Sequence, residues 1–85
     1  MTKQELMQIT LLGFKISYTN VSFISYRNTS LNILLDVHLN NAYTGAFELS
    51  KTKNDGERMH ALYNTETFEA MIKHITNYIG EQNDN

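Results

Sequence analysis

Apolar residues occupy every second position from Leu31 to Leu39, in the stretch LNILLDVHL. Successive side chains of a β-strand point to opposite faces of a sheet, so a period of two over nine residues predicts a half-buried strand. On a helix, the same residues would place apolar groups around the whole circumference. We therefore expect the odd-numbered side chains to be buried and the even-numbered ones to face outward.

The composition predicts one small folded domain over residues 1–85. The chain is 41% hydrophobic and 19% charged, as ordinary globular proteins are. It has no apolar run of the roughly 18 residues that cross a bilayer, and its first residues lack the apolar core of a signal peptide. We expect a cytoplasmic protein with no membrane partner. The absence of cysteine excludes disulfides, thiol catalysis and cysteine-ligated metal.

The N-terminus carries the signature of a short helix. Thr2 and Glu5 have the spacing of a capping box, and Gly13 is suited to the left-handed position after a helix. These signals predict a helix from Lys3 to Leu12. The apolar residues near its end also alternate, so a strand there stays open as an alternative.

Two strands are expected over 14–18 and 21–27, before the organising strand. A two-residue loop between them places Ile16 opposite Phe23. A three-residue loop after the second strand then places Phe23 opposite Leu35. Paired residues share a face, so these registers predict that the apolar side chains of both strands gather on the buried side.

The strand that follows Leu39 can be registered in two ways. A two-residue turn would send Tyr43 and Phe47 to the outward face. One further loop residue, Ala42, pairs Leu39 with Tyr43 and Leu35 with Phe47, so that all of them are buried. A one-residue slip moves every side chain to the other face, so burial favours the longer loop.

A fifth strand is expected from Arg58 to Tyr63. It follows a turn in which Gly56 is suited to a positive φ, and a three-residue loop pairs Leu49 with Ala61. The alternative is that residues 51–58 form a polar loop.

The last predicted element is an amphipathic helix that is capped by Asn64 or Thr65, ends near Ile79 and has Gly80 just past its end. Residues 81–85 are expected to form a polar tail. One stripe of the helix is apolar, at Phe68, Met71, Ile72, Ile75 and Ile79.

Together these elements predict an α+β fold: a short N-terminal helix, an antiparallel meander of four or five strands and a C-terminal helix. That helix is expected to pack on the face that carries Phe23, Ile33, Leu35, Val37, Phe47 and Leu49.

The polar residues of the organising strand do not form a recognisable catalytic or metal site. Asp36 and His38 would lie beside Ser22, but side chains two apart on a strand stand parallel and do not converge on a nucleophile. His38, His60 and His74 lack the spacing of metal ligands. We therefore expect no enzymatic activity, no cofactor and no metal.

A small apolar patch with a charged rim is the strongest functional signal. On the outward face the expected registers bring together Ile24, Tyr26, Leu34, Asp36, His38, Ala46 and Glu48. Such a patch is typical of a surface that binds a protein partner. Three alternatives stay open: the N-terminal helix covers the patch, a homodimer buries it, or it has no role.

Nucleic-acid binding is the second function considered. Tyr26, Tyr43 and Tyr63 could stack on bases, but the expected registers bury two of them. The outward face would carry Asp36 and Glu48, and the net charge is −2. Both features argue against a nucleic-acid partner.

The composition resembles that of accessory proteins of phages and mobile elements from AT-rich bacterial genomes. The chain is small, lacks Pro, Cys and Trp, and is rich in Asn, Thr, Ile and Tyr. Many such proteins bind and inhibit a host or rival protein. The resemblance implies an inhibitor of this anti-defence type and assigns no role to any single residue.

Overall fold

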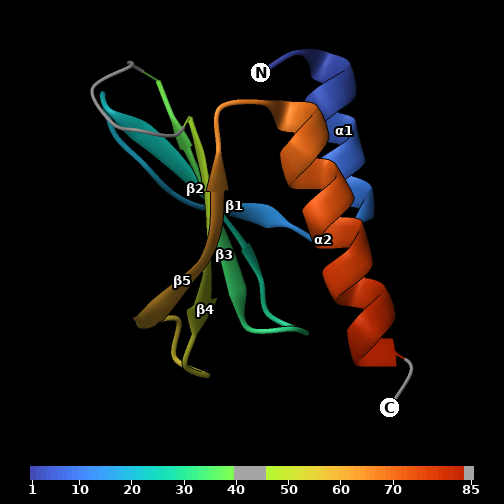
Figure 1. Ribbon diagram of the computed structural model, residues 1–85. Helices are drawn as coiled ribbons and strands as arrows, with labels where there is room; N and C mark the ends of the chain where they lie inside the picture. Colours follow the sequence, from blue (N-terminus) through green and yellow to red (C-terminus); the bar gives the residue numbers. More distant parts are fainter. Residues whose placement is uncertain (40–45, 84–85) are drawn as a thin grey trace.

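The structure of the chain is a computed structural model that describes residues 1–39 and 46–83. Within these ranges its elements are, in order, α1 (Lys3–Leu11), β1 (Lys15–Thr19), β2 (Phe23–Asn28), β3 (Ile33–His38), β4 (Phe47–Thr52), β5 (Arg58–Thr65) and α2 (Phe68–Asn83). The strands form one antiparallel sheet in chain order, β1 to β5. Figure 1 shows this sheet edge-on, with both helices side by side on one of its faces. The predicted α+β meander is confirmed.

The N-terminal helix forms as its caps predict. The Thr2 side chain accepts a hydrogen bond from the backbone N–H of Glu5, and the Glu5 carboxylate accepts one from the N–H of Thr2. At the other end, Gly13 has a φ of 98°. The backbone N–H of Phe14 donates to the carbonyl of Ile9 in a Schellman-type cap. Both of these side chains belong to the core, so the cap also fixes where α1 meets the sheet.

The core lies between the sheet and the two helices. The predicted stripe of α2 is confirmed, because Met71 and Ile75 are fully buried and its other members pack against the same cluster. The buried apolar residues of this cluster are Ile9, Phe14, Tyr26, Ile33, Leu35, Val37, Phe47, Leu49, Met71 and Ile75. None of the helices described within 1–39 and 46–83 is long and apolar enough to span a membrane.

The predicted ends of α2 are wrong. The cap is Thr67, whose hydroxyl accepts a hydrogen bond from the backbone N–H of Ala70 at 3.3 Å. Neither Asn64 nor Thr65 can cap the helix, because β5 continues through both. The helix also passes through Gly80 and includes residues 81–83, which were expected to form a tail.

The register between β2 and β3 differs from the prediction by three residues. Tyr26 lies opposite Leu35, and Phe23 lies opposite His38. The predicted three-residue loop is too short, because the turn includes Asn32 at a φ of 54°, a conformation that asparagine tolerates better than most residues. An odd shift exchanges the two faces of β2. The expected pairing of Phe23 with Leu35 is therefore wrong.

The register between β1 and β2 is wrong for a similar reason. Ile16 lies opposite Tyr26 and not opposite Phe23, and Thr19 lies opposite Ile24. The side chain of Asn20 accepts hydrogen bonds from two backbone N–H groups in the turn, which lengthens the loop. An irregularity between Ile16 and Tyr18 then turns these two side chains to opposite faces.

Beyond β3 the faces were predicted correctly but the alignment was not. Leu35 lies opposite Leu49, two residues from the expected partner Phe47. Because a shift of two residues is even, both side chains stay on the buried face. The prediction that burial favours the longer loop is therefore confirmed for the faces of β4, though not for the exact pairs. The expected pairing of Leu39 with Tyr43 lies outside the described residues.

The predicted fifth strand is confirmed. It runs two residues further than expected, to Thr65, and Leu49 lies opposite Tyr63 instead of Ala61. Two register shifts along its pairing with β4 account for the difference. Gly56, in the turn before this strand, has the expected positive φ, at 92°.

Candidate binding surface on the outer face of the sheet

One face of the sheet turns away from both helices (Figure 1), and we call it the outer face. The registers assign to it alternate residues of the three central strands, together with Lys15 and Tyr18 of β1 and Arg58, Ala61 and Asn64 of β5. The central strands contribute Phe23, Ser25, Arg27, Leu34, Asp36, His38, Glu48, Ser50 and Thr52. α1 lies on the same side as α2, so the alternative in which α1 covers the outer face is wrong.

Two members of the predicted patch lie on the helix side instead. Ile24 lies opposite Val37 and packs against the core. Tyr26 is 4% exposed, and its burial raises the pKa of the phenol above its ordinary value. Both residues were assigned to the wrong face because the three-residue shift in register exchanges the two faces of β2. The apolar patch expected around Ile24, Tyr26 and Leu34 is therefore not a surface of this chain.

Leu34 is on the outer face, as predicted, but it is only 8% exposed. Its neighbours across the sheet are Arg27 on β2 and Ser50 on β4. The long side chain of Arg27 extends from β2 to the turn between β4 and β5, where its Nη2 donates to the backbone carbonyl of Asn54 at 2.8 Å. A Cβ at Gly56 would lie 2.9 Å from Arg27 Nη1, so the guanidinium lies directly on this glycine.

A second arginine crosses the outer face from the opposite edge. Arg58 of β5 donates from Nη2 to Asp36 of β3, which also accepts a hydrogen bond from the Ser25 hydroxyl. Asp36 is 2% exposed, so it is shielded by the groups that neutralise it. To reach it, the Arg58 side chain must pass over Ser50 on β4.

The middle of the outer face is therefore closed by polar side chains. Ser50 and Thr52 are fully or almost fully buried, yet neither hydroxyl has a hydrogen-bond partner among the described residues. Nε of Arg27 is likewise buried without an acceptor in the described part of the chain. Stems of long charged side chains commonly cover sheet surface in this way.

Two remaining members of the predicted patch, Glu48 and His38, lie further along the same face. Glu48 is half-buried opposite Asp36. Ala46 is half-buried and packs against the core, and its carbonyl accepts a hydrogen bond from the backbone N–H of His38. His38 is half-buried as well, and its ring contacts Phe23.

An aromatic row crosses this end of the outer face, and the sequence prediction missed it. It consists of Tyr18, Phe23 and His38, whose ring centroids are 5.7 Å and then 5.9 Å apart. Tyr18 is 54% exposed. Two further exposed apolar side chains, Val21 and Leu39, lie at the same end of the sheet, where the N–H of Leu39 donates to the carbonyl of Ser22.

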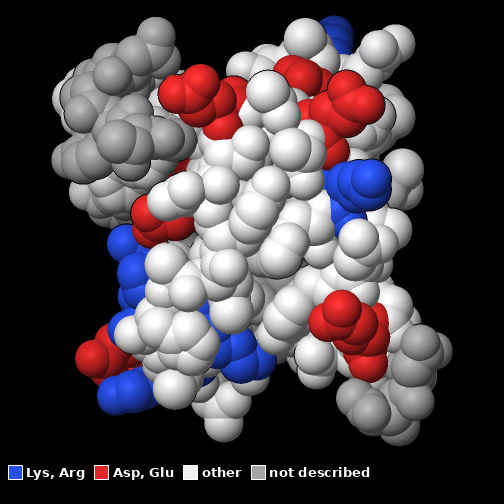
Figure 2. Space-filling view, viewed as in Figure 1, with Lys and Arg blue, Asp and Glu red and all other residues white. Residues whose placement is uncertain are grey.

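The charges of the outer face differ from those of the helix side. The registers place three cations on the outer face (Lys15, Arg27 and Arg58) with two acids (Asp36 and Glu48). Figure 2 shows basic side chains at the lower left, with acidic atoms among them, on the side of the sheet that faces away from the helices. Acidic side chains gather at the top, where α2 begins. The outer face is thus more basic than the chain as a whole.

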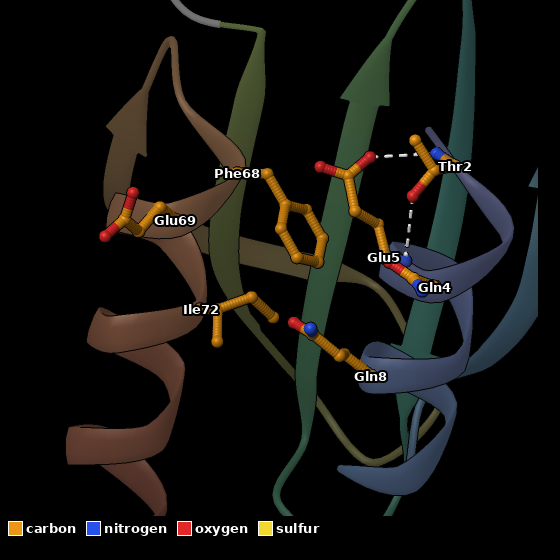
Figure 3. Close-up of a pocket in the computed structure, with 7 residues that line it drawn as sticks. All are labelled: Thr2, Gln4, Glu5, Gln8, Phe68, Glu69 and Ile72. Carbon is orange, nitrogen blue, oxygen red and sulfur yellow. Dashed lines mark hydrogen bonds between the residues drawn. The ribbon is translucent and has the colours of Figure 1, made fainter.

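The groove between α1 and α2 is the other candidate site. It has a volume of about 420 Å³, and Figure 3 shows Phe68 and Ile72 of α2 turned toward α1. The Glu5 carboxylate beside it already accepts the backbone N–H of Thr2 at 2.8 Å. Its acid therefore serves the cap of α1, and we interpret the groove as a packing seam between the helices.

The histidines considered as metal ligands lie apart. His74 of α2 stacks on Tyr63 of β5, with centroids 4.2 Å apart and planes 6° apart. His60 of β5 lies opposite Lys51 of β4, and His38 of β3 is on the outer face. Within residues 1–39 and 46–83, no three metal-ligating side chains come together.

No family model, curated protein or solved structure matches the chain significantly.

Proposed function

We propose that this chain is a non-enzymatic protein-binding module that acts through the aromatic row of the outer face. One observation carries the proposal: Tyr18, Phe23 and His38 form a continuous, partly exposed surface on a sheet face that no described helix covers. Aromatic side chains dominate the energetics of protein interfaces because they bury a large area at a small cost in conformational entropy.

The surroundings of the row suit an interface. The exposed side chains of Val21 and Leu39 extend the apolar area at one end. Arg27 and Arg58 lie further along the face and supply a polar rim. The proposed surface keeps the outer face and His38 from the sequence prediction, and replaces the buried residues with Tyr18 and Phe23.

The proposal includes a cellular role. The composition resembles that of phage and mobile-element accessory proteins, many of which inhibit a host or rival protein. We propose a cytoplasmic inhibitor or modulator of this kind. Its small size and its outer face, which no described helix covers, suit it to cover a surface of its target.

Site-specific photocrosslinking tests this proposal. A benzophenone amino acid at Tyr18 should form an adduct with one protein in a lysate of the organism that carries the sequence. The matched control is the same amino acid at Ile16, which lies on the same strand and is 63% exposed but faces the helix side. Adduct formation at Tyr18 and not at Ile16 is expected. Equal adducts at both positions, or none at Tyr18, would contradict the proposal.

Homodimerisation through the same row is a competing outcome. An adduct at Tyr18 with twice the mass of the chain, together with a dimer in sedimentation velocity, would replace the foreign partner with a second copy.

Nucleic-acid binding is a second candidate function because the row could also stack bases, as sheets of single-strand binders do. Of the tyrosines first considered for this role, Tyr26 is in the core, Tyr63 stacks on His74, and Tyr43 lies outside the described residues. A mobility-shift assay at low salt with single- and double-stranded DNA and RNA separates the two functions. Retardation there would favour nucleic acid.

A further inference from the structure

A cleft separates the C-terminal half of α2 from β5. It has a volume of about 340 Å³ and is lined by Leu62 of β5 and by His74, Asn77, Tyr78 and Glu81 of α2. Two residues join β5 to α2, and Figure 1 shows the two elements moving apart with distance from this junction. The cleft lies at the β5 edge of the sheet, whereas the aromatic row begins on β1 at the other edge.

A β-bulge directs Leu62 toward the cleft. Tyr63 lies opposite Leu49 and Ala61 lies opposite Ser50, so Leu62 is an extra residue between two neighbouring pairs. An extra residue interrupts the alternation of side chains along a strand. Leu62 and Tyr63 are consecutive, yet both pack against the core on the helix side. The bulge therefore supplies the cleft with an apolar wall.

The opposite wall is held in place by a ring contact. His74 lines the cleft and stacks on Tyr63, with ring centroids 4.2 Å apart. Because Leu62 precedes Tyr63 in the strand, it lies at the end of the cleft that carries His74. This end is thus formed before any ligand binds, which lowers the entropic cost of binding.

The cleft lies beside an unpaired strand edge. β5 is the last strand of the sheet, and no described strand pairs with its outer edge. An edge strand presents backbone N–H and C=O groups that can pair with another strand. Extended peptides bind such edges as an added strand, with backbone hydrogen bonds for affinity and pockets for alternate side chains for specificity. Leu62 belongs to both the edge and the cleft, so one peptide could use both.

The length of the cleft fits a short extended segment. From His74 to Glu81 it follows seven positions of α2, or about 10 Å of helix. At about 3.3 Å per residue, about three residues of an extended chain span this length. Two side chains of the segment, two positions apart, would point to the same side.

The far end of the cleft favours a cation. Glu81 lines it there, and α2 has no basic residue in its last turn. The carbonyl groups at the C-terminus of a helix carry a partial negative charge, which attracts cations. Figure 2 shows acidic side-chain atoms at the lower right, where α2 ends. The cleft therefore runs from an apolar end at Leu62 to an acidic end at Glu81.

We infer that this cleft binds a short extended segment of a protein partner, which joins the sheet as an added strand beside β5. An aliphatic side chain of the segment packs on Leu62, and a Lys or Arg two positions away reaches Glu81. The inference goes beyond the proposed function, because it assigns a second interaction surface at the opposite edge of the sheet.

Peptide selection tests the inference without knowledge of the natural partner. The probe is a library of random decapeptides displayed on phage and selected on the immobilised full-length chain. Depletion on the Asn77→Trp variant, whose new side chain fills the cleft, first removes peptides that bind elsewhere. The remaining peptides should carry an aliphatic residue two positions from a Lys or Arg. The inference is wrong if no binding peptide remains, or if the remaining peptides lack basic residues.

Two further variants show whether the selected peptides occupy the cleft. Thr76→Trp is the matched control, because it adds the same side chain at the neighbouring exposed position of α2, which does not line the cleft. It should change binding less than twofold, whereas Glu81→Gln should weaken it several-fold. Far-UV circular dichroism checks that each variant is folded. Loss of binding in Thr76→Trp, or unchanged binding in Glu81→Gln, would contradict the assigned site.

Methylation of the peptide backbone tests the added strand. Each N-methyl group removes one N–H donor, and in a paired strand only alternate residues direct their N–H groups to the neighbouring strand. Within the segment that fills the cleft, methylation should weaken binding at least tenfold at alternate positions and less than threefold between them. A uniform effect, or none, would show that the peptide binds by its side chains alone and would overturn the inference.

Discussion

Leu34 and Leu35 are neighbours on β3, and both are shielded from solvent, but different groups shield them. Leu35 is fully buried among apolar side chains of the sheet and the helices. Leu34 is 8% exposed and lies between Arg27 and Ser50, where no described helix covers the sheet. One face is closed by a packed apolar core and the other by two arginines that cross it.

This difference shows that burial alone does not identify a core. On the helix side, burial removes apolar area from water, and this is the main favourable contribution to folding. On the outer face, burial encloses a carboxylate and hydroxyl groups that must be compensated. The helix side should therefore determine stability, whereas the outer face is free to carry a function.

The pair of neighbouring leucines gives the largest test of this comparison. Leu35→Ala should lower the free energy of unfolding by about 2–5 kcal/mol, because it leaves a cavity in a tightly packed core. Leu34→Ala removes the same atoms from beneath arginine side chains that can settle into the space, and should cost about 1–2 kcal/mol. Urea unfolding measures both. Equal losses would mean that the two faces are packed alike.

The ion pair of the outer face gives a smaller effect. Arg58→Met should lower the free energy of unfolding by about 1–3 kcal/mol, because Asp36 then loses a charged hydrogen-bond donor. The side chain of Arg58 is 46% exposed, so the loss should fall short of that for a fully buried pair.

Combining Arg58→Met with Asp36→Asn is the matched control. The double variant removes the charge that Arg58→Met leaves uncompensated, and should recover part of the stability. Urea unfolding of the two variants measures this recovery. No recovery would mean that Arg58 acts by covering the sheet and not by its charge.

The smallest effect concerns the phenol of Tyr26 on the helix side. Its burial raises its pKa, so above about pH 10 the folded chain holds this proton more tightly than the unfolded chain does. The free energy of unfolding should then fall as the pH rises from 9 to 11. Tyr26→Phe should make this fall less steep, after correction for any difference between the two proteins at pH 7. An unchanged slope would show that Tyr26 is protonated equally in both states.

The sequence predicted the elements far better than it predicted their partners. Both caps of α1 and the apolar stripe of α2 could be identified because they depend on neighbours within four residues. The alternation that ends at Leu39 identified the central strand for the same reason. The candidate site could not be predicted with the same success, since it depends on which residues face each other across strands.

Two asparagine side chains show where local reasoning failed. Asn20 bonds two backbone N–H groups of the β1–β2 turn. Asn28 accepts the N–H of Leu31 and donates to the carbonyl of Leu12, at the end of α1. Asparagine side chains commonly accept backbone N–H groups two or three residues ahead, so the bonds of Asn20 could have indicated a longer turn. The bond from Asn28 to Leu12 depends on a helix sixteen residues away and is invisible in the local sequence.

The sequence by itself determined which segments of this chain are helices and strands and which side of β3 meets α2, because these follow from short-range periodicity and capping. Only the tertiary structure decided the register of β1 and β2, the burial of Leu34 and the assembly of the aromatic row. The physical reason is that a sheet side chain alternates strictly with position. A change of one residue in a loop therefore moves an entire strand's side chains to the opposite face.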